Sequence, residues 1–515
     1  MGSESITPER IFMYTAPQLS WKKIHYILLT LIIFLTCAAQ VYLFKQEFYS
    51  ISADESGRIL QSVELTFRQI LKPTYYPPLY ALINKLGLSL YYDLFLTPRI
   101  LTSIVGIAAS MALMFLAYRL FGNSTISIIT GFLAICFPHR LVFSVAPLSE
   151  IYFMCFMTLG CALVLGWIAD ERKEDLLFST ICFSLCSALR YEGWLACATM
   201  AGILTVQRFI TKKPDWGAYL ATISVLISFP LYWFLSAYFT RSMWAFSSIS
   251  QYYIDSHGKD PVDVWQRSFL YQFIEQSVFS PLIAGLVSFA YHAVRDRNVR
   301  LLSLLLMIPI LGMTALGFAT YALPVHNWWR VAGPALFLLL PFLAHLIYKV
   351  CAAIFINRHV YCMSLIIVTS LVVSSFYAET GRRTKQSNFT GDHLRAGTFL
   401  KGLGLKGTDK ILIDTSTWMY TNVIVASNMP DRFIMNTGPD PLYPKPAVIE
   451  FKKGIDVTLL KKMQIKYLMF QTKEGPGINK PEFLAKISAQ AAILHKSPAL
   501  KKINQIGEWG IFAVQ

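Results

Sequence analysis

The sequence predicts a polytopic α-helical membrane protein with about eleven transmembrane helices and a small C-terminal α/β soluble domain. The composition is the first observation behind this fold class: of 515 residues, 55% are hydrophobic, 14% are aromatic and only 15% are charged. The second is the recurrence of apolar runs of about twenty residues, the length that crosses a bilayer as a helix. The third is a sharp change of composition near residue 379, where short mixed segments replace these runs.

The first apolar run covers about 24–44, behind an N-terminal tail at 1–23. It is longer than a signal-peptide core and no small-residue cleavage site follows it, so we expect it to be retained as a helix. Ten further spans complete a transmembrane module over 24–378. We expect them at about 97–118, 125–143, 150–168, 176–190, 193–210, 217–239, 278–294, 301–322, 331–348 and 360–378.

Lysines and arginines gather in alternate connecting segments. If the N-terminus is cytoplasmic, the inner segments carry fourteen of them and the short outer turns carry only Arg140, Arg190 and Arg330. This asymmetry is the one that the positive-inside rule requires. We therefore expect a plasma or inner membrane protein whose long loops 45–96 and 240–277 face the outside (periplasm, extracellular space or lumen), as does the tail 379–515.

The tail alternates strand-like and helix-like segments, which predicts a small α/β domain. It holds twenty Lys and Arg against eleven Asp and Glu. Anionic lipid heads or a phosphate-bearing substrate nearby would explain this charge, and an ordinary basic solvated surface explains it equally well. The expected strands are 410–414, 432–436, 466–471 and 510–514, and the expected helices are 393–403 and 481–494.

Metal and disulfide chemistry find little support in the sequence. All nine cysteines lie in or beside apolar runs without metal-ligand spacing, which favours a packing role. Asp255, His257 and Asp260 could ligate a metal, but three polar residues in one loop are weak evidence. We predict no cofactor and no metal ligand, and leave a divalent cation open.

The acidic pair Asp54-Glu55 lies in a polar stretch just after the first helix. A carboxylate at the boundary between lipid and water can act as a general base toward a membrane-embedded substrate. Asp54 is our candidate base, and Glu55 has the weaker role of orienting Asp54 or a substrate hydroxyl. The competing explanation is a pair of solvated acids at a helix N-terminus, where the helix dipole stabilises negative charge.

Arginines at the outer ends of the spans are candidates for binding a phosphate, because a guanidinium donates two parallel hydrogen bonds and keeps its charge. They are Arg99, Arg190 and Arg330, with Arg140 a weaker candidate. Each of them has an ordinary explanation as an arginine whose head snorkels to the membrane surface.

Five further residues are candidates for substrate binding: Glu150, Glu192, His139, His326 and Tyr76. Glu150 also suits the N-terminus of a helix, and Glu192 suits an ion pair with Arg190. Tyr76 stands beside the Pro77-Pro78 break that follows an amphipathic stretch at 58–72. We expect that stretch to form a surface helix, and 79–92 to lie in the membrane interface.

The order of these features resembles the GT-C superfamily of membrane glycosyltransferases, especially the branch with protein O-mannosyltransferases and lipid A aminoarabinose transferases. The resemblance covers roughly residues 20–380. It rests on Ala53-Asp54-Glu55-Ser56-Gly57, Pro77-Pro78-Leu79-Tyr80, Pro98-Arg99, Ala146-Pro147-Leu148-Ser149-Glu150 and Ala188-Leu189-Arg190-Tyr191-Glu192-Gly193.

The resemblance implies a polyprenyl-phosphate-linked sugar donor and transfer, with inversion, to a hydroxyl of a glycan, lipid or protein acceptor. Membrane lipids are the other expected partners, and nucleic acid is not expected. Such a transfer needs a base and cations but no covalent nucleophile. Two other classes stay open: a transporter or flippase of a lipid-linked substrate, which predicts charged or broken helices at the bilayer midplane, and a non-catalytic membrane scaffold.

Overall fold

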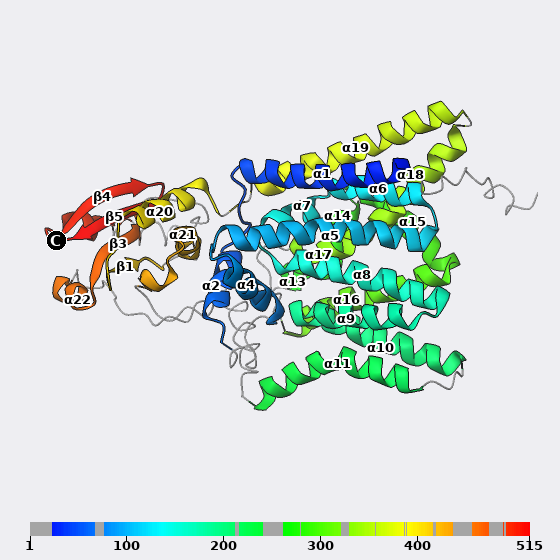
Figure 1. Cartoon of the computed structure of the whole chain (residues 1–515), viewed down its shortest axis with the longest axis horizontal. Helices are drawn as coiled ribbons and strands as arrows, with labels where there is room; N and C mark the ends of the chain where they lie inside the picture. Colours follow the sequence, from blue (N-terminus) through cyan, green and yellow to red (C-terminus); the bar gives the residue numbers. More distant parts are fainter. Residues whose placement is uncertain are drawn as a thin grey trace, which may run out of the picture.

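The computed structural model describes residues 23–66, 77–211, 216–239, 261–278, 280–320, 329–355, 357–385, 387, 389–415, 419–435, 456–472, 488 and 491–515. A helical bundle occupies most of the long axis, and an α/β domain lies at one end of it (Figure 1). The short helices α2 and α4 lie at that same end, between the bundle and the domain.

The elements follow one another in this order: α1 (Lys23–Lys45), α2 (Asp54–Glu64), α4 (Leu79–Leu90), α5 (Leu96–Phe121), α6 (Ser124–Ile135), α7 (Pro138–Val145), α8 (Ser149–Asp170), α9 (Lys173–Leu189), α10 (Glu192–Thr211), α11 (Trp216–Phe239), α13 (Pro261–Arg267), α14 (Phe269–Val278), α15 (Leu282–Arg295), α16 (Arg297–Thr320), α17 (Trp329–Phe337), α18 (Leu340–Ile354), α19 (Arg358–Thr384), α20 (Gly391–Gly402), β1 (Lys410–Ile413), α21 (Tyr420–Ser427), a 3-10 turn (Pro430–Arg432), β2 (Phe433–Met435), α22 (Val457–Lys462), β3 (Ile465–Gln471), β4 (Leu500–Ile506) and β5 (Trp509–Val514).

Every predicted span corresponds to a helix or to a bent pair of helices. By length and composition, six described helices can cross a membrane, namely α1, α5, α8, α11, α16 and α19, and the count rises to nine if each of three bent pairs is one span. Helices α9 and α10 fall outside this set: α9 has only 17 residues, near the lower limit for spanning. The protein is therefore a multi-pass membrane protein, as predicted, with fewer unbroken spans than eleven.

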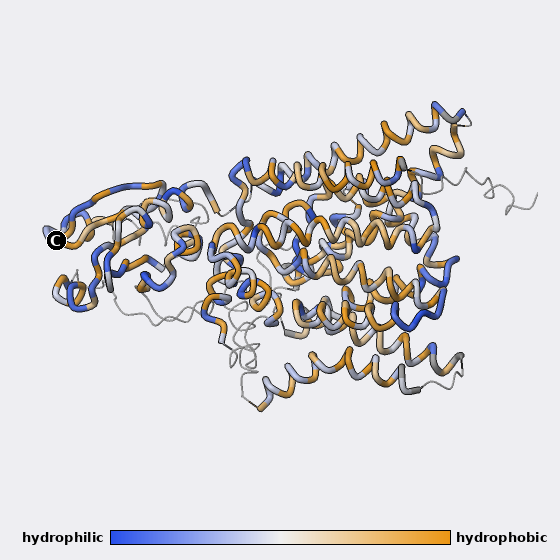
Figure 2. The backbone as a smooth tube through the Cα atoms, in the orientation of Figure 1, coloured by the Kyte–Doolittle hydropathy of each residue, from blue (hydrophilic) through white to orange (hydrophobic). Residues whose placement is uncertain are grey.

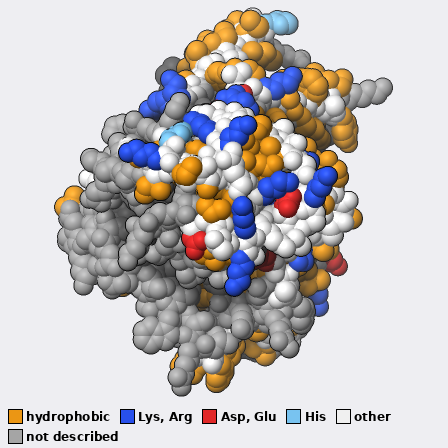
Figure 3. All heavy atoms as spheres, turned by 90° about the vertical axis from the view of Figure 1, so that its left-hand side faces the viewer, with side chains coloured by type: hydrophobic (Ala, Val, Ile, Leu, Met, Phe, Trp, Pro, Cys, Tyr) orange, Lys and Arg blue, Asp and Glu red, His pale blue; other side chains and the backbone are white. Residues whose placement is uncertain are grey.

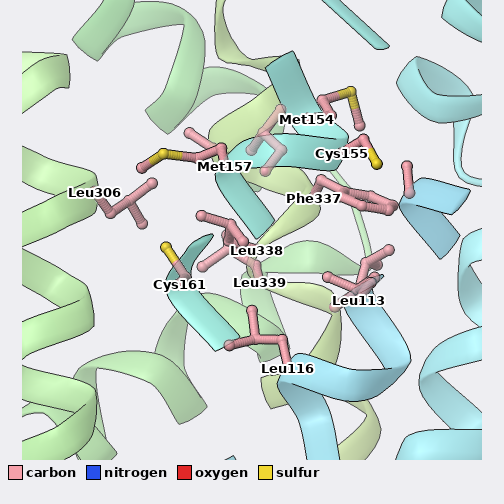
Figure 4. Packing of buried hydrophobic residues seen from close by; sticks show 14 of the residues in the cluster. Leu113, Leu116, Met154, Cys155, Met157, Cys161, Leu306, Phe337, Leu338 and Leu339 are labelled. Carbon is pink, nitrogen blue, oxygen red and sulfur yellow. The ribbon is translucent and has the colours of Figure 1, made fainter. Parts of the chain in front are cut away.

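Helix α8 lies at the centre of the bundle. In the most apolar 18-residue stretch of α8, 78% is buried, against 22% for the corresponding stretch of α1 and 11% for that of α19. Met154, Met157 and Cys161 of α8 belong to the same buried cluster as Leu113 of α5 and Phe337 at the end of α17 (Figure 4). Apolar residues run along the length of the bundle and hydrophilic ones collect at its ends (Figure 2). A residue at the end of α8 is consequently fixed in position by a helix that is buried over most of its length.

A break between α6 and α7 bends that span by 56°. Proline cannot continue the helical hydrogen bonds at Pro138, so carbonyl groups at the end of α6 lose their partners. Arg140 supplies the missing donors: its Nε donates to Ala134 O at 3.0 Å and its Nη2 to Ile135 O. In a bilayer no water is present to do so. Arg140, expected at the outer end of a span, is instead fully buried in this break.

The C-terminal domain contains a five-stranded mixed sheet with the order β2-β1-β3-β5-β4. Strand β1 runs parallel to β2 and β3, and β5 is antiparallel to β3 and β4. All four predicted strands and the helix predicted at 393–403 are present, whereas β4, α21 and α22 were not predicted. Most of the helix predicted at 481–494 lies outside the described residues. Lysines and arginines are spread over the face of the domain directed away from the bundle (Figure 3).

The domain docks on the segments that were predicted to form the first outer loop. Ile59 and Leu94 from that loop share a buried cluster with Phe389, Val423 and Ile424 of the domain. Polar bonds add to the contact: Leu94 N donates to Asn428 Oδ1 at 2.9 Å, and Ser387 Oγ donates to Ser50 O at 2.7 Å. This contact agrees with the expectation that the first outer loop and the C-terminal tail lie on the same side of the membrane.

Gly397 of α20 packs directly on α21, which makes the domain sensitive to one methyl group. A Cβ at Gly397 would lie 2.5 Å from the backbone carbonyl carbon of Ala426, whereas a Cβ at Gly402, in the same helix, would meet nothing within 4 Å. We expect Gly397→Ala to destabilise the domain by about 1–3 kcal/mol through overpacking. Hydrogen exchange of the β1 and β3 amides in the full-length protein measures this loss, and unchanged exchange relative to Gly402→Ala would contradict it.

Candidate active site

The turn before α2 places the two acids of Asp54-Glu55 in different environments. The Glu55 side chain folds back and is fully buried. It accepts hydrogen bonds from Ile51 N at 3.1 Å, from Ser52 N at 3.1 Å and from Ser52 Oγ at 2.6 Å. Burial raises the pKa of the Glu55 carboxyl, against the opposing effect of Arg330. Glu55 thus holds the shape of the turn, and its predicted role in orienting Asp54 or substrate stays a prediction.

Asp54 begins α2 and points toward Arg330. Its Oδ2 lies 3.6 Å from Arg330 Nη1, and 24% of its side chain is exposed against 2% for Arg330. Arg330 Nη1 also lies 3.4 Å from Ser52 Oγ, which in turn bonds Glu55. The acidic pair is therefore split: Asp54 faces outward beside a guanidinium, and Glu55 faces inward.

Five residues from four parts of the chain form one alternating series of charges, which we call the charge ladder. In order they are Asp54, Arg330, Glu150, Arg190 and Glu192. Arg330 donates from Nε at 3.0 Å and from Nη2 at 2.6 Å to Glu150 Oε1, and Arg190 Nη1 lies 2.9 Å from the same oxygen. Arg190 Nη2 then donates to Glu192 Oε1 at 2.6 Å. The ladder joins the start of α2 to α17, to α8 and to the connection between α9 and α10.

Asp54 is the most exposed member of the charge ladder. The Glu150 side chain is 1% exposed and the Glu192 side chain 7%, against 24% for Asp54. Charges buried to this degree are stable only with partners of opposite sign and good hydrogen-bond geometry. Among the three carboxylates of the ladder, Asp54 is therefore the most exposed, while the others hold the arginines.

Two contacts behind the ladder involve residues that were not proposed from the sequence. Arg58, one helical turn after Asp54 on α2, donates from Nη1 to Ser149 Oγ at 2.7 Å, and Ser149 Oγ lies 3.3 Å from Glu150 Oε2. The Tyr80 hydroxyl donates to Pro147 O. Arg58 could have been recognised in the sequence from its position four residues after the candidate base Asp54, because residues at this spacing lie on one face of a helix.

The remaining predicted residues lie apart from the ladder. Arg99 is buried and donates to Phe95 O at 2.6 Å and to Tyr49 O at 2.9 Å, with its guanidinium over the Phe95 ring. It ties α5 to the cluster under the C-terminal domain. His139 lies in a separate polar cavity. The predicted phosphate-binding role of Arg99, Arg190 and Arg330 and the substrate-binding roles of Glu150, Glu192 and His139 stay predictions.

Part of the predicted site falls outside the described residues, namely Tyr76, His326 and the stretch 240–260 of the second outer loop. The rest of that loop forms α13 and α14, and α14 packs on α17. Within the described part of the chain, no three His, Cys, Asp or Glu side chains are grouped so as to hold a metal ion.

The bundle, the buried charges at its domain-bearing end and the docked α/β domain together define the class: a multi-pass membrane protein whose fold is shared by solved structures of other proteins. No protein-family model matches the chain, and no curated protein matches it by sequence. The similarity to particular known proteins therefore comes from the comparison of structures.

Two solved proteins carry this comparison. ArnT from Cupriavidus metallidurans, an aminoarabinose transferase solved bound to undecaprenyl phosphate, is 13% identical with a TM-score of 0.61, over 95% of this chain and 97% of its own. The oligosaccharyltransferase AglB from Archaeoglobus fulgidus, solved with an inhibitory peptide and a dolichol-phosphate, is 11% identical with a TM-score of 0.50, over 96% of this chain and 75% of its own.

The raised pKa of Glu55 makes the stability of the turn depend on pH. Folding raises this pKa, so the stability linked to the Glu55 proton is present at low pH and is lost as the pH rises through the raised value. Glu55→Gln keeps an acceptor oxygen and does not titrate. We expect the unfolding midpoint of the wild type to fall relative to Glu55→Gln as the pH is raised from about 4 to 8. Parallel curves for the two proteins would refute this.

Glu150 is expected to contribute more to stability than Glu192, because it neutralises two buried guanidiniums. Glu150→Gln leaves both without their shared anion, and breaking a buried ion pair in this way costs about 3–5 kcal/mol. Among the described residues, Glu192 forms an ion pair with Arg190 alone, so Glu192→Gln serves as the matched control. Thermal unfolding of the two variants in nanodiscs measures the difference, and equal midpoints would contradict the central place given to Glu150.

Proposed function

We propose that this protein is an inverting glycosyltransferase that moves a sugar from a polyprenyl-phosphate carrier to an acceptor hydroxyl on the outer face of the membrane. The observation that carries the proposal is the position of Asp54 as the exposed end of an otherwise buried charge ladder. A base of this kind needs a fixed orientation, a nearby cation and access to substrate. Asp54 has the contact with Arg330 and the exposure that such a base needs.

The fold supports a lipid-linked donor. ArnT and AglB, which share this fold, were solved with undecaprenyl phosphate and with a dolichol-phosphate. By analogy, the donor here is a sugar on a polyprenyl phosphate, and the acceptor is a hydroxyl-bearing glycan, lipid or protein. The clustering of basic residues in the opposite connecting segments favours the outer face as the side of the reaction.

In the proposed reaction, Asp54 accepts the proton of the acceptor hydroxyl while the hydroxyl oxygen bonds to the anomeric carbon. The bond between that carbon and the phosphate oxygen breaks on the opposite side, so the configuration inverts. The polyprenyl phosphate leaves with the bonding electrons, and a cation stabilises its charge. We assign this role first to Arg330, because it contacts Asp54, whereas Arg190 lies further along the ladder and Arg99 lies in the interdomain cluster.

The test uses purified protein in nanodiscs, a panel of polyprenyl-phosphate sugars and hydroxyl acceptors. Asp54→Asn keeps the size of the side chain and removes the base, so we expect the rate of transfer to fall by about 10²–10⁴-fold. Glu64→Gln, at the other end of α2, is the matched control and should transfer at the wild-type rate. Equal thermal unfolding midpoints for Asp54→Asn, Glu64→Gln and the wild type exclude a folding defect as the cause of a lower rate.

Two outcomes would count against the proposal. Transfer by Asp54→Asn at the wild-type rate would remove Asp54 as the base. Movement of a lipid-linked sugar across the nanodisc or liposome membrane, with no transfer by the wild type to any acceptor, would replace the glycosyltransferase with a transporter or flippase.

A further inference from the structure

A polar cavity of about 790 Å³ lies between α7, the turn from α14 to α15, the start of α17 and the end of α19. Its volume falls within the usual range for small-molecule sites, about 300–1,000 Å³. Polar side chains line much of it, and Phe137, Leu336 and Phe376 contribute apolar walls. Nothing in the proposed transfer step uses these residues.

His139 and Gln276 form the centre of the hydrogen bonds in this polar cavity. His139 Nε2 lies 2.8 Å from Gln276 Oε1 and 3.1 Å from Trp329 O. Both neighbours are acceptors, so Nε2 carries the proton and Nδ1 of the neutral ring is an acceptor. Gln276 Nε2 donates to Gln272 Oε1 at 3.0 Å, and Arg383 Nη2 donates to Gln276 Oε1 at 3.2 Å.

Two residues of the cavity wall each carry a buried polar atom without a partner. His139 Nδ1, an acceptor, and Trp329 Nε1, a donor, are both buried and have no hydrogen-bond partner among the described residues. The His139 side chain is 2% exposed as a whole. Buried polar groups are normally satisfied, so unmatched ones mark this wall as polar. Because both atoms lie beneath the surface of the cavity, a ligand meets instead the partly exposed side chains of Glu275, Gln276 and Ser280, which together donate and accept hydrogen bonds.

The charges in the wall indicate that this ligand is neutral. The described lining residues include two cations, Arg382 and Arg383, and two acids, Glu275 and Glu379, of which Glu379 lies 2.8 Å from Arg383 Nε. A phosphate would gain from the arginines but would be repelled by the carboxylates. Hydroxyl groups both donate and accept, and planar Gln, Glu and Arg side chains suit pairs of them. A sugar matches this set.

The polar cavity adjoins the charge ladder through α17. Trp329, in the cavity wall, directly precedes Arg330 of the ladder. The ring of Trp329 is held between Arg383, at 4.4 Å, and Phe143, at 5.7 Å with an angle of 11° between the rings. A ligand that contacts Trp329 therefore contacts the turn of α17 that also carries Arg330.

We propose that the polar cavity binds a neutral sugar residue. Granted the proposed function, on which this last step rests, that sugar is a non-reacting unit of a glycan or glycolipid acceptor, held while its reacting hydroxyl meets Asp54. Sugar binding itself does not depend on whether transfer occurs.

The experiment measures binding of methyl glycosides to the wild-type protein in nanodiscs by saturation-transfer NMR, with inorganic phosphate as the competing probe. The panel holds the methyl glycosides of glucose, mannose, galactose and N-acetylglucosamine. Gln276→Leu removes the centre of the hydrogen-bond network. We expect the dissociation constant of the glycoside to increase by at least about tenfold, the equivalent of one lost buried hydrogen bond. Ser280→Ala removes one hydroxyl of the cavity wall and nearly keeps its shape, so a smaller loss is expected; it also keeps the test valid if Gln276→Leu does not fold.

Asp54→Asn separates this inference from the proposed function, because it should stop transfer and leave glycoside binding unchanged. Binding that survives in Asp54→Asn and weakens in both cavity variants supports the sugar site even if no transfer is found. The sugar site is overturned if no glycoside binds the wild type, if both cavity variants bind as the wild type does, or if inorganic phosphate displaces the glycosides.

Discussion

A single carboxylate oxygen, Oε1 of Glu150, organises the domain-bearing end of the bundle. It accepts from Arg330 on α17 and lies beside Arg190 in the connection after α9. It is held at the first turn of α8, the most buried of the six described helices that are long and apolar enough to span a membrane. Each guanidinium buried there needs an anion, and each anion needs its cations. Helices α8 and α17, the start of α2 and the α9–α10 connection consequently keep their relative positions through one another's charges.

The chemistry proposed for Asp54 depends on that arrangement in two ways. Arg330 is fixed from behind by Glu150, so the guanidinium that meets Asp54 does not need to be ordered when substrate arrives; preorganisation of this kind is what makes a polar site effective. On the other flank, Glu55 fixes the turn that carries Asp54 by accepting three hydrogen bonds from Ile51 and Ser52. Asp54 is left as the exposed member of a set whose other members are committed to one another.

Patterns along the chain were sufficient for most of the secondary structure but not for the tertiary contacts between its elements. Apolar runs predicted a helix at every span, and alternation predicted four strands, because both signals are local. The bends within three spans and the shortness of α9 were missed, since they depend on caps such as Arg140 and on packing. Strand β4 reads LKKINQI, with too many polar residues at its exposed positions to be recognised.

The candidate site could likewise be predicted from the sequence only in part. The distinct character of Asp54 was predictable from its place after the first helix. That Glu150 belongs to Arg330, 180 residues later, that Glu55 bonds its own backbone, and that Arg99 binds carbonyl groups are consequences of tertiary contacts. A guanidinium at the end of an apolar helix looks the same in sequence whether its partner is a carboxylate or a main-chain oxygen.

The docking of the C-terminal domain on the first outer loop has a consequence for how the protein is made. Ile59 and Leu94 find their partners only when Phe389 and Val423 have emerged from the ribosome. At about 5–20 residues per second, the chain between Leu94 and Phe389 takes on the order of 15–60 seconds to synthesise. During that interval an apolar surface on the helix that begins with Asp54 lacks its cover. Exposed apolar surface of this kind makes a folding intermediate prone to aggregate until translation ends.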